Sequence, residues 1–184
     1  MPLAVLKPAS VSDVMKALRY ANETGLKVSV RGQGHSRWGQ TLAADGILID
    51  SSTLNAVAIS DAGVAEAQTG AQWYMVVEPA LQRGLVPPTL GTCLKLSVGG
   101  ILNVGGYSNS SHLHGGIVDQ VLELEVVTGD GRLIECSPRR NGELFDMTLG
   151  GMGNIAMMTR AKVRLMPAPE HVDRKSTRLN SSHT

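Results

Sequence analysis

The sequence is organised around the stretch Val30-Arg-Gly-Gln-Gly-His-Ser-Arg-Trp-Gly-Gln40. A short apolar run over residues 26–30 leads into it and predicts a buried strand. Gly32 and Gly34 then let the backbone turn sharply and approach a bulky ligand, because no Cβ stands in the way. Successive N–H groups in such a turn form a concavity suited to a pyrophosphate. His35 follows at the lip of this loop, where it is placed to meet the ligand.

The composition is that of one globular domain of ordinary size. Of the 184 residues, 42% are hydrophobic and 18% are charged, which argues against disorder. The net charge of +1 gives no electrostatic reason to expect nucleic acid or an anionic membrane as a partner. No run approaches the roughly 18 apolar residues of a membrane helix. Residues 1–8 lack the features of a signal peptide, which slightly favours a cytoplasmic location.

The C-terminal residues 173–184 differ abruptly from the rest. They are polar, show no periodicity and follow the proline-containing stretch 166–169. Residues 173–183 also resemble the translation of a common sequencing-library adapter. We therefore expect 173–184 to be a non-native tail and leave it out of the fold. Residues 1–172 are then the native domain, and either end of this domain can be incomplete. We expect the natural protein to continue beyond residue 172.

The chain begins with an α/β pattern. Residues 11–23 carry apolar side chains at helical spacing. Ser10 is a natural N-cap, Asp13 completes a capping box with Asp in place of Glu, and Gly25 ends the helix. A strand over residues 27–30 follows.

Period-two runs and turn residues predict the remaining elements. Gly129-Asp-Gly131 predicts a hairpin turn. Pro79 kinks or ends the second predicted helix, which covers residues 72–83. No regular structure is expected at residues 85–88. The predicted helices cover 72–83 and 142–149, and the predicted strands cover 46–50, 56–60, 64–69, 119–128, 132–136 and 155–165.

A second glycine segment, Leu96-Ser-Val-Gly-Gly-Ile-Leu-Asn-Val-Gly-Gly-Tyr107, contains two Gly-Gly pairs separated by apolar residues. Backbone without side chains suits close packing against a flat ligand. A glycine-rich turn in the core is the alternative, and the segment alone does not decide between them.

Several familiar chemistries are excluded or disfavoured. The loop at 32–37 lacks the third glycine of the dinucleotide motif, and no phosphate-binding Walker A motif is present. His112 and His114 could share one strand face as metal ligands, but no third ligand accompanies them, so a solvated loop is favoured and no metal is expected. Cys93 and Cys136 have no zinc-type spacing, and a disulfide between them is left open.

Few carboxylates lie near either glycine segment. Such a site suits a cofactor that carries the chemistry itself while the protein orients it. His35 and Ser36 form no catalytic dyad, because adjacent side chains on an extended backbone diverge.

Several motifs in register resemble the FAD-binding domain of cytokinin oxidase/dehydrogenases, and more broadly PCMH-type flavoproteins related to vanillyl-alcohol oxidase. The resemblance runs from about Val5 to Pro169. The motifs, in order, are Arg31–Ser36 with Gly39-Gln40, Leu96–Gly100, His114-Gly115, Asp119–Gly131, Glu143–Asp146 and Leu149–Gly153 with Met158–Arg160.

The resemblance implies an α+β fold, a PCMH-type FAD-binding domain of two α/β subdomains that clasp FAD, truncated before the substrate domain. It implies that Gly32, Gln33, Gly34 and Ser36 form the pyrophosphate loop and that His35 is bonded covalently to the flavin 8α-methyl. It also implies FAD contacts at Gln40, Thr92, Ser97, Asn103, Tyr107 and Met157. Asn103 replaces a usual serine and Tyr107 a usual isoleucine.

Two residues depart from the family's pattern or extend it. Thr92 stands at the position of the family's catalytic aspartate, and threonine cannot act as a general base near neutral pH. This argues against cytokinin oxidation by the family's mechanism and leaves the catalytic residue unknown. Cys93 has the spacing of the cysteine that makes a second flavin bond in berberine-bridge-type oxidases, although a buried inert thiol is the simpler interpretation.

We therefore expect part of an FAD-dependent oxidase or dehydrogenase that passes hydride from a small organic substrate to covalent FAD, with oxygen or another acceptor reoxidising the flavin. The alternatives are a berberine-bridge-type bicovalent oxidase of sugars or alcohols, and a flavin-binding homologue without turnover. The fragment alone is expected to be inactive.

Overall fold

The computed structural model describes residues 1–36, 39 and 41–170. The helices are α1 (Val11–Thr24), α2 (Trp73–Leu81), α3 (Val98–Val104), α4 (Ser111–His114) and α5 (Gly142–Thr148). The strands are β1 (Ala4–Leu6), β2 (Val28–Arg31), β3 (Ile47–Asp50), β4 (Val57–Ser60), β5 (Val64–Gln68), β6 (Leu85–Val86), β7 (Val121–Val127), β8 (Leu133–Cys136), β9 (Met157–Arg164) and β10 (Met166–Pro167). Single 3-10 turns occur at Ser51–Thr53 and Val118–Gln120.

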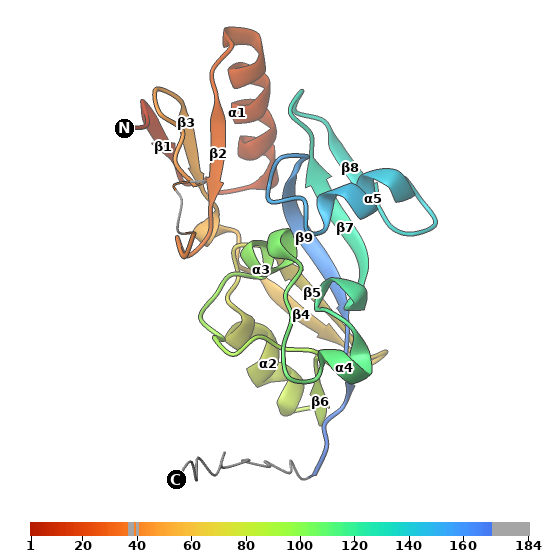
Figure 1. Cartoon of the computed structure of the whole chain (residues 1–184). Helices are drawn as coiled ribbons and strands as arrows, with labels where there is room; N and C mark the ends of the chain where they lie inside the picture. Colours follow the sequence, from red (N-terminus) through yellow and green to blue (C-terminus); the bar gives the residue numbers. More distant parts are fainter. Residues whose placement is uncertain (37–38, 40, 171–184) are drawn as a thin grey trace, which may run out of the picture.

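The first subdomain is a parallel sheet in the order β1-β3-β2, with α1 packed on one face (Figure 1). The predicted capping box is present: the Asp13 N–H donates to Ser10 Oγ, and Asp13 Oδ2 accepts from the Ser10 N–H at 3.0 Å. Gly25 ends the helix at φ 70°, a conformation that glycine adopts without steric cost. The cap therefore fixes where α1 begins and how it meets the sheet.

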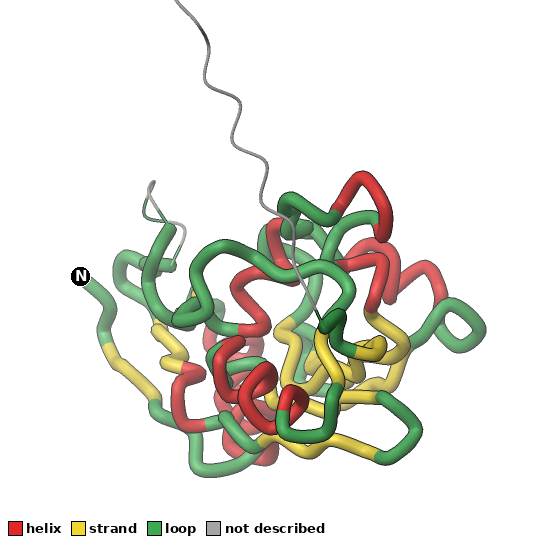
Figure 2. The backbone as a smooth tube through the Cα atoms, turned by 90° about the horizontal axis from the view of Figure 1, so that it is seen from below, coloured by secondary structure: helices red, strands yellow, loops and turns green. Residues whose placement is uncertain are grey.

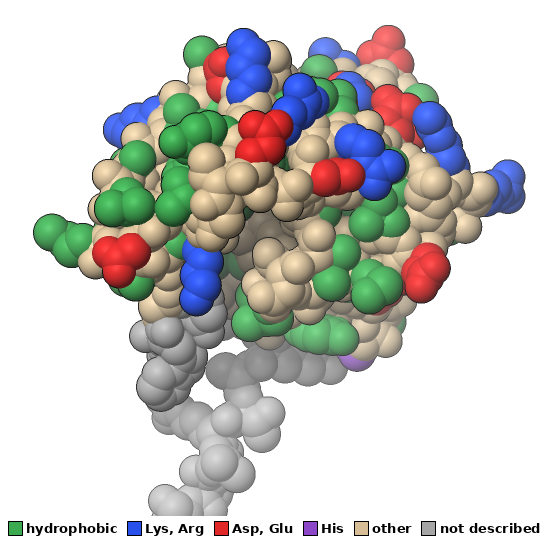
Figure 3. Space-filling view, turned by 90° about the horizontal axis from the view of Figure 1, so that it is seen from above, with side chains coloured by type: hydrophobic (Ala, Val, Ile, Leu, Met, Phe, Trp, Pro, Cys, Tyr) green, Lys and Arg blue, Asp and Glu red, His purple; other side chains and the backbone are tan. Residues whose placement is uncertain are grey.

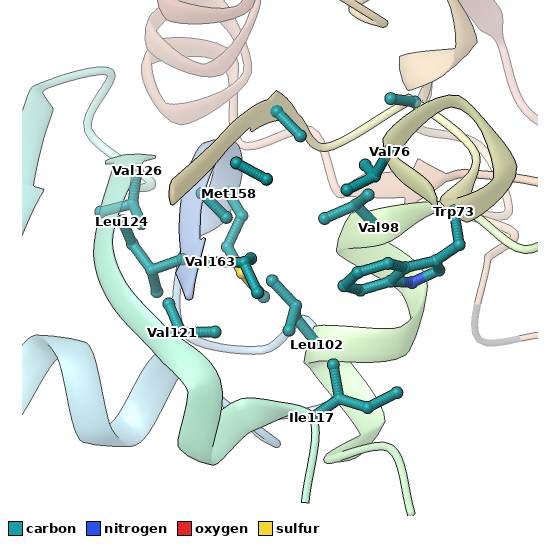
Figure 4. Close-up of a cluster of buried hydrophobic side chains, with 14 of the residues drawn as sticks. Trp73, Val76, Val98, Leu102, Ile117, Val121, Leu124, Val126, Met158 and Val163 are labelled. Carbon is teal, nitrogen blue, oxygen red and sulfur yellow. The ribbon is translucent and has the colours of Figure 1, made fainter. Parts of the chain in front are cut away.

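The second subdomain is an antiparallel sheet in the order β4-β5-β9-β7-β8. Its inner face carries Ala65, Ala67, Leu124 and Val163, all buried. Helices α2 and α3 cover this face, and Trp73 and Leu102 from those helices point into the same cluster (Figure 4). Figure 2 shows the two groups of strands from below, with the parallel one on the side of the N-terminus.

The two subdomains share buried contacts. Val127 at the end of β7 and Met157 at the start of β9 belong to the same hydrophobic cluster as Val14 and Leu18 of α1. Burying a large apolar side chain contributes about 1.5–3 kcal/mol. The contact between α1 and the larger sheet is therefore part of the core.

The outer face of the antiparallel sheet is charged. Arg160 Nη1 lies 2.7 Å from Glu66 Oε1, and its Nη2 lies 3.0 Å from Glu125 Oε2. Lys162 Nζ pairs with Glu123 Oε1 at 2.8 Å. Figure 3 shows another face, the molecule seen from above, where cationic and anionic side chains are intermixed, in keeping with the net charge of +1.

Most predicted elements are confirmed, with shifts of a few residues at their ends. Pro79 lies inside α2 rather than ending it. The expectation of no regular structure at 85–88 was wrong, because β6 pairs with β10. β1, α3 and α4 were not predicted. None of the helices in the described part of the chain combines the length and the apolar character needed to span a bilayer.

Candidate functional site

The first glycine loop leaves the parallel sheet at the carboxyl end of β2. There Arg31 is the register partner of Asp50 on β3, and the Arg31 carbonyl accepts a hydrogen bond from Ser51 Oγ at 3.1 Å. In open α/β sheets, ligands bind at the carboxyl ends of parallel strands. Gly34 has φ +73° and His35 is exposed. The loop thus has the position and the backbone conformation of a ligand-binding turn.

The loop lies directly against the second glycine segment. A Cβ on Gly32 would lie 2.1 Å from Ser97 Oγ and 3.0 Å from Ser97 Cβ, which is closer than side-chain atoms pack. Ser97 is 3% exposed, and its Oγ accepts from the Gly100 N–H at 3.3 Å as the N-cap of α3. The structure therefore brings together the two segments that the sequence singled out.

The first part of the second segment is a helix rather than the glycine-rich turn that the sequence left as the alternative. Residues 98–104 form α3, and the first glycine pair lies inside this helix. A Cβ on Gly99 would lie 2.8 Å from Thr69 Cβ, and the Gly99 N–H donates to the Thr69 carbonyl at 2.8 Å. The glycine is therefore explained by the close approach of α3 to the end of β5.

The second glycine pair ends the helix. Gly105 and Gly106 have φ +93° and +63°, and the Gly106 carbonyl accepts from the Ile117 N–H at 2.7 Å. Tyr107, next in the chain, is 79% exposed. The backbone here folds back toward Ile117 and leaves the tyrosine ring accessible.

Asn103 carries a polar atom that lacks a partner. Its Nδ2 donates to the Gly99 carbonyl at 2.8 Å, whereas its Oδ1 is buried and receives no hydrogen bond from any described residue. Buried acceptors are rarely left without a donor. A Cβ on Gly153 would lie 3.8 Å from this Oδ1. FAD carries hydroxyl and N–H donors, so Asn103 Oδ1 and the two adjoining glycine segments fit that cofactor.

Thr92 and Cys93 are both exposed. Cys93 lies on the segment leading to Ser97, and the Leu96 N–H donates to the Cys93 carbonyl at 3.4 Å. Cys136, in contrast, is fully buried, and burial together with the charge of Glu123 raises the pKa of its thiol to about 11. Both cysteines are free, so the disulfide left open from the sequence is not formed.

The other residues predicted to contact FAD differ in how exposed they are. The Met157 side chain is 6% exposed and belongs to the hydrophobic cluster around α1, so only its backbone remains for a cofactor. Ser36 is exposed and Gln33 is half-buried. Gln40 lies outside the described residues.

The histidine pair at 112 and 114 does not share a strand face. Both residues lie on α4, and the ring Nδ1 of His112 is 2.8 Å from the Asn109 carbonyl oxygen. Side chains two apart on a helix diverge. Among the residues that the structure places, no three His, Cys, Asp or Glu side chains gather in a way that could hold a metal ion.

Sequence reasoning missed two residues that shape this site. Thr69 is 3% exposed, and its Oγ1 donates to the Met158 carbonyl at 2.6 Å. This bond ties the residue on which α3 packs to β9. Arg31 lies with its guanidinium against Gly34. Its position before the glycine loop was the available signal, whereas nothing in the sequence pointed to Thr69.

The charge of Asp50 is also favoured beside this loop. Partial burial opposes ionisation, but hydrogen bonds from Ser52 and the charges of Lys7 and Arg31 outweigh it, so the pKa of Asp50 is lowered. Asp50 Oδ1 accepts the Ser52 N–H at 3.1 Å. The carboxylate is therefore held by its own turn.

Two surface hollows among the described residues lie elsewhere. They have volumes of about 330 and 370 Å³ and lie on the outer, charged face of the antiparallel sheet. Glu66 lines both. Because α3 covers the opposite face, neither hollow belongs to the glycine site.

Curated proteins with similar sequences include oxidoreductases. An uncharacterized oxidoreductase, ORF5 of the fasciation locus of Rhodococcoides fascians, is 42% identical over 93% of this chain and 39% of its own length. Cytokinin dehydrogenase 9 of Oryza sativa subsp. japonica is 40% identical over 93% of this chain and 34% of its own length. The chain thus spans little more than a third of these relatives.

A solved structure shares the fold. 6-Hydroxy-D-nicotine oxidase from Arthrobacter nicotinovorans superposes with a TM-score of 0.83 at 30% identity, covering 89% of this chain and 36% of the oxidase. The family described as FAD binding domain matches residues 2–137. These residues include both glycine segments, α3 and the Asn103 acceptor. The chain therefore belongs to the FAD binding domain family, among the cytokinin-dehydrogenase-like flavoproteins of the PCMH type.

Proposed function

We propose that this chain is the cofactor-binding part of an FAD-dependent oxidoreductase that oxidises a small organic substrate. The observation that carries the proposal is the contact of Gly32 with Ser97, which joins the two glycine segments into one cradle. When bound, FAD supplies the acceptor for hydride from the substrate, and oxygen or another acceptor takes the electrons from it. The protein's part is to bind and orient the cofactor.

Within this proposal, His35 is the site of covalent attachment to the flavin. His35 is exposed next to the left-handed Gly34, at the lip of the loop. An imidazole nitrogen is the nucleophile that a bond to the flavin 8α-methyl requires. Because His35 is exposed, its ring is accessible to a cofactor.

The other binding roles follow from position. The N–H groups of residues 32–36 would hold the pyrophosphate, and Asn103 Oδ1 would accept a hydrogen bond from a cofactor hydroxyl or N–H. Ser97, Tyr107, Gln40 and the backbone of Met157 would complete the cradle.

The extent of the functional domain is part of the proposal. Residues 1–172 form the FAD-binding domain, and residues 173–184 are a non-native tail. Because the relatives are about three times as long as the matched region, we propose that a substrate domain completes the pocket in the natural protein. Residues 1–184 alone would then bind flavin without turning over substrate.

Thr92 bears on the substrate class. It stands where cytokinin dehydrogenases carry their catalytic aspartate, and its exposed hydroxyl cannot take a proton near neutral pH. A substrate that needs an amine deprotonated would require a base from elsewhere. A homologue that binds flavin without turnover would also tolerate threonine here.

One observation favours a second candidate. Cys93 is exposed and free, unlike the inert buried thiol that was the simpler interpretation. An accessible thiol just before α3 suits a second flavin bond, as in a berberine-bridge-type oxidase of sugars or alcohols.

The test is the visible spectrum of the FAD-reconstituted chain before and after acid precipitation. Yellow colour that stays in the pellet, and is lost in His35→Ala, supports covalent attachment at His35. Colour that persists in His35→Ala but is lost in the double variant His35→Ala/Cys93→Ser supports the second candidate. Colour released to the supernatant would refute both covalent assignments, and a folded chain that takes up no flavin would refute the proposed function.

A further inference from the structure

Arg31 places a positive charge beside the first glycine loop, with its guanidinium against Gly34. Where a Cβ on Gly34 would stand, the nearest atoms are Arg31 Nε at 3.1 Å, Nη2 at 3.4 Å and Cζ at 3.5 Å. The side of Gly34 that a Cβ would occupy is therefore filled by the Nε–Nη2 edge of the guanidinium. Because Gly34 has no side chain, it can adopt φ +73°. It also leaves space for the Arg31 guanidinium.

Asp50 is the register partner of Arg31, and the charge of Arg31 helps to lower the pKa of Asp50. The two side chains nevertheless form no direct ion pair, and Asp50 Oδ1 accepts the Ser52 N–H instead. Within the described part of the chain, Arg31 makes no ion pair. A guanidinium beside a loop of N–H donors adds positive potential where an anion is expected.

We propose that Arg31 is the positioning residue of the diphosphate site: it braces Gly34 in its left-handed conformation and supplies the positive charge that selects a diphosphate-containing flavin. This inference rests on the proposed binding of FAD by residues 32–36. It predicts that Arg31 matters for FAD and not for riboflavin, which carries the same ring system without phosphate.

The test compares Arg31→Met and Arg31→Lys in a His35→Ala/Cys93→Ser background, so that neither candidate covalent bond can form and binding stays reversible. Arg139→Met is the matched control, because Arg139 is exposed and forms no ion pair with a described residue. Dissociation constants for FAD and riboflavin are measured by flavin fluorescence at ionic strengths of about 0.05 and 0.5 M, which span strong and weak screening. Melting temperatures of the apo chains verify folding.

We expect Arg31→Met to weaken FAD binding by roughly ten- to one-hundredfold, the range of one charge-assisted contact, and riboflavin binding by less than about twofold. The salt dependence for FAD should shrink in Arg31→Met and persist in Arg31→Lys and Arg139→Met. Equal weakening of both flavins, or an unchanged salt dependence, would overturn the role of Arg31 alone. A folded His35→Ala/Cys93→Ser parent that binds no FAD would overturn the proposed function and this inference with it.

Discussion

Replacing Gly32 with alanine probes the contact that joins the two glycine segments. The added Cβ would lie 2.1 Å from Ser97 Oγ, so one of the two residues must move. Gly32 is not in the left-handed region, and the cost therefore comes from the contact rather than from backbone strain. The first glycine loop and α3 would be pushed apart at the point where they meet.

The size of the effect follows from what Ser97 does. If its side chain rotates away, α3 loses the N-cap bond to Gly100, which costs about 1 kcal/mol. Overpacking at a site that is 3% exposed adds about 1–3 kcal/mol. We expect Gly32→Ala to lower the free energy of unfolding by about 2–4 kcal/mol.

A double-mutant cycle isolates this contact. Ser97→Gly keeps N-cap stability to within a few tenths of a kcal/mol and removes both clashing atoms, so Gly32→Ala should cost less than about 1 kcal/mol in that background. Gly129→Ala is the control, because a Cβ there meets no atom within 4 Å. Urea unfolding of the apo chain, followed by tryptophan fluorescence, gives the four values.

The outcome against this reasoning is additivity. If Gly32→Ala costs the same with serine or glycine at 97, the two segments do not touch as described. A cost for Gly129→Ala comparable to that of Gly32→Ala would likewise show that the glycine effect is general rather than local.

Three further predictions concern the rest of the domain. A thiol reagent at pH 8 should label Cys93 rapidly and leave Cys136 untouched until the chain unfolds, because the Cys136 thiol is buried with a pKa of about 11; mass spectrometry of Cys93→Ser should show no label, and a labelled native Cys136 would contradict this. Because the pKa of Asp50 is lowered by folding, its charge should contribute stability above about pH 4 and lose it as the pH falls further. Asp50→Asn should thus cost up to about 0.5 kcal/mol at pH 6 and nothing near pH 3 by urea unfolding, and an equal cost at both pH values would count against the charge. Arg160→Met should lower the free energy of unfolding by about 2 kcal/mol. This is less than for a fully buried ion pair, because the Arg160 side chain is 29% exposed. An unchanged urea midpoint would refute this estimate for the outer-face ion pairs.

Local signals allowed much of the fold to be predicted. α1 was found because Ser10, Asp13 and Gly25 act on their immediate neighbours, and the β7–β8 hairpin because Gly131 adopts the turn conformation φ +77°. In both cases, residues close in sequence determine the structure. Tertiary context adjusts only the ends.

The elements that were missed depend on distant partners. α3 contains two glycines, which lower helix propensity; it forms because Ser97 caps it and Gly99 packs on Thr69. β1 has three residues and gains its hydrogen bonds from β3. Such pairings are not visible in local periodicity.

The same division applies to the candidate site. The glycine loop and His35 were identified from their local pattern and the family resemblance, and the structure places them at a strand end. The contact of Gly32 with Ser97 and the unpaired oxygen of Asn103 needed coordinates, because each depends on segments that meet only in the folded chain.

The strand order has a consequence for biosynthesis. β9 lies between β5 and β7, although it is the last strand of the large sheet to leave the ribosome. Until residues 157–164 emerge, β5 and the β7–β8 hairpin have unpaired edges toward each other, and their apolar inner faces are uncovered at the centre. Pairing across such sequence separations is slow and prone to aggregation. The facing edges of β5 and β7 therefore stay open to incorrect strand pairing until β9 has been synthesised.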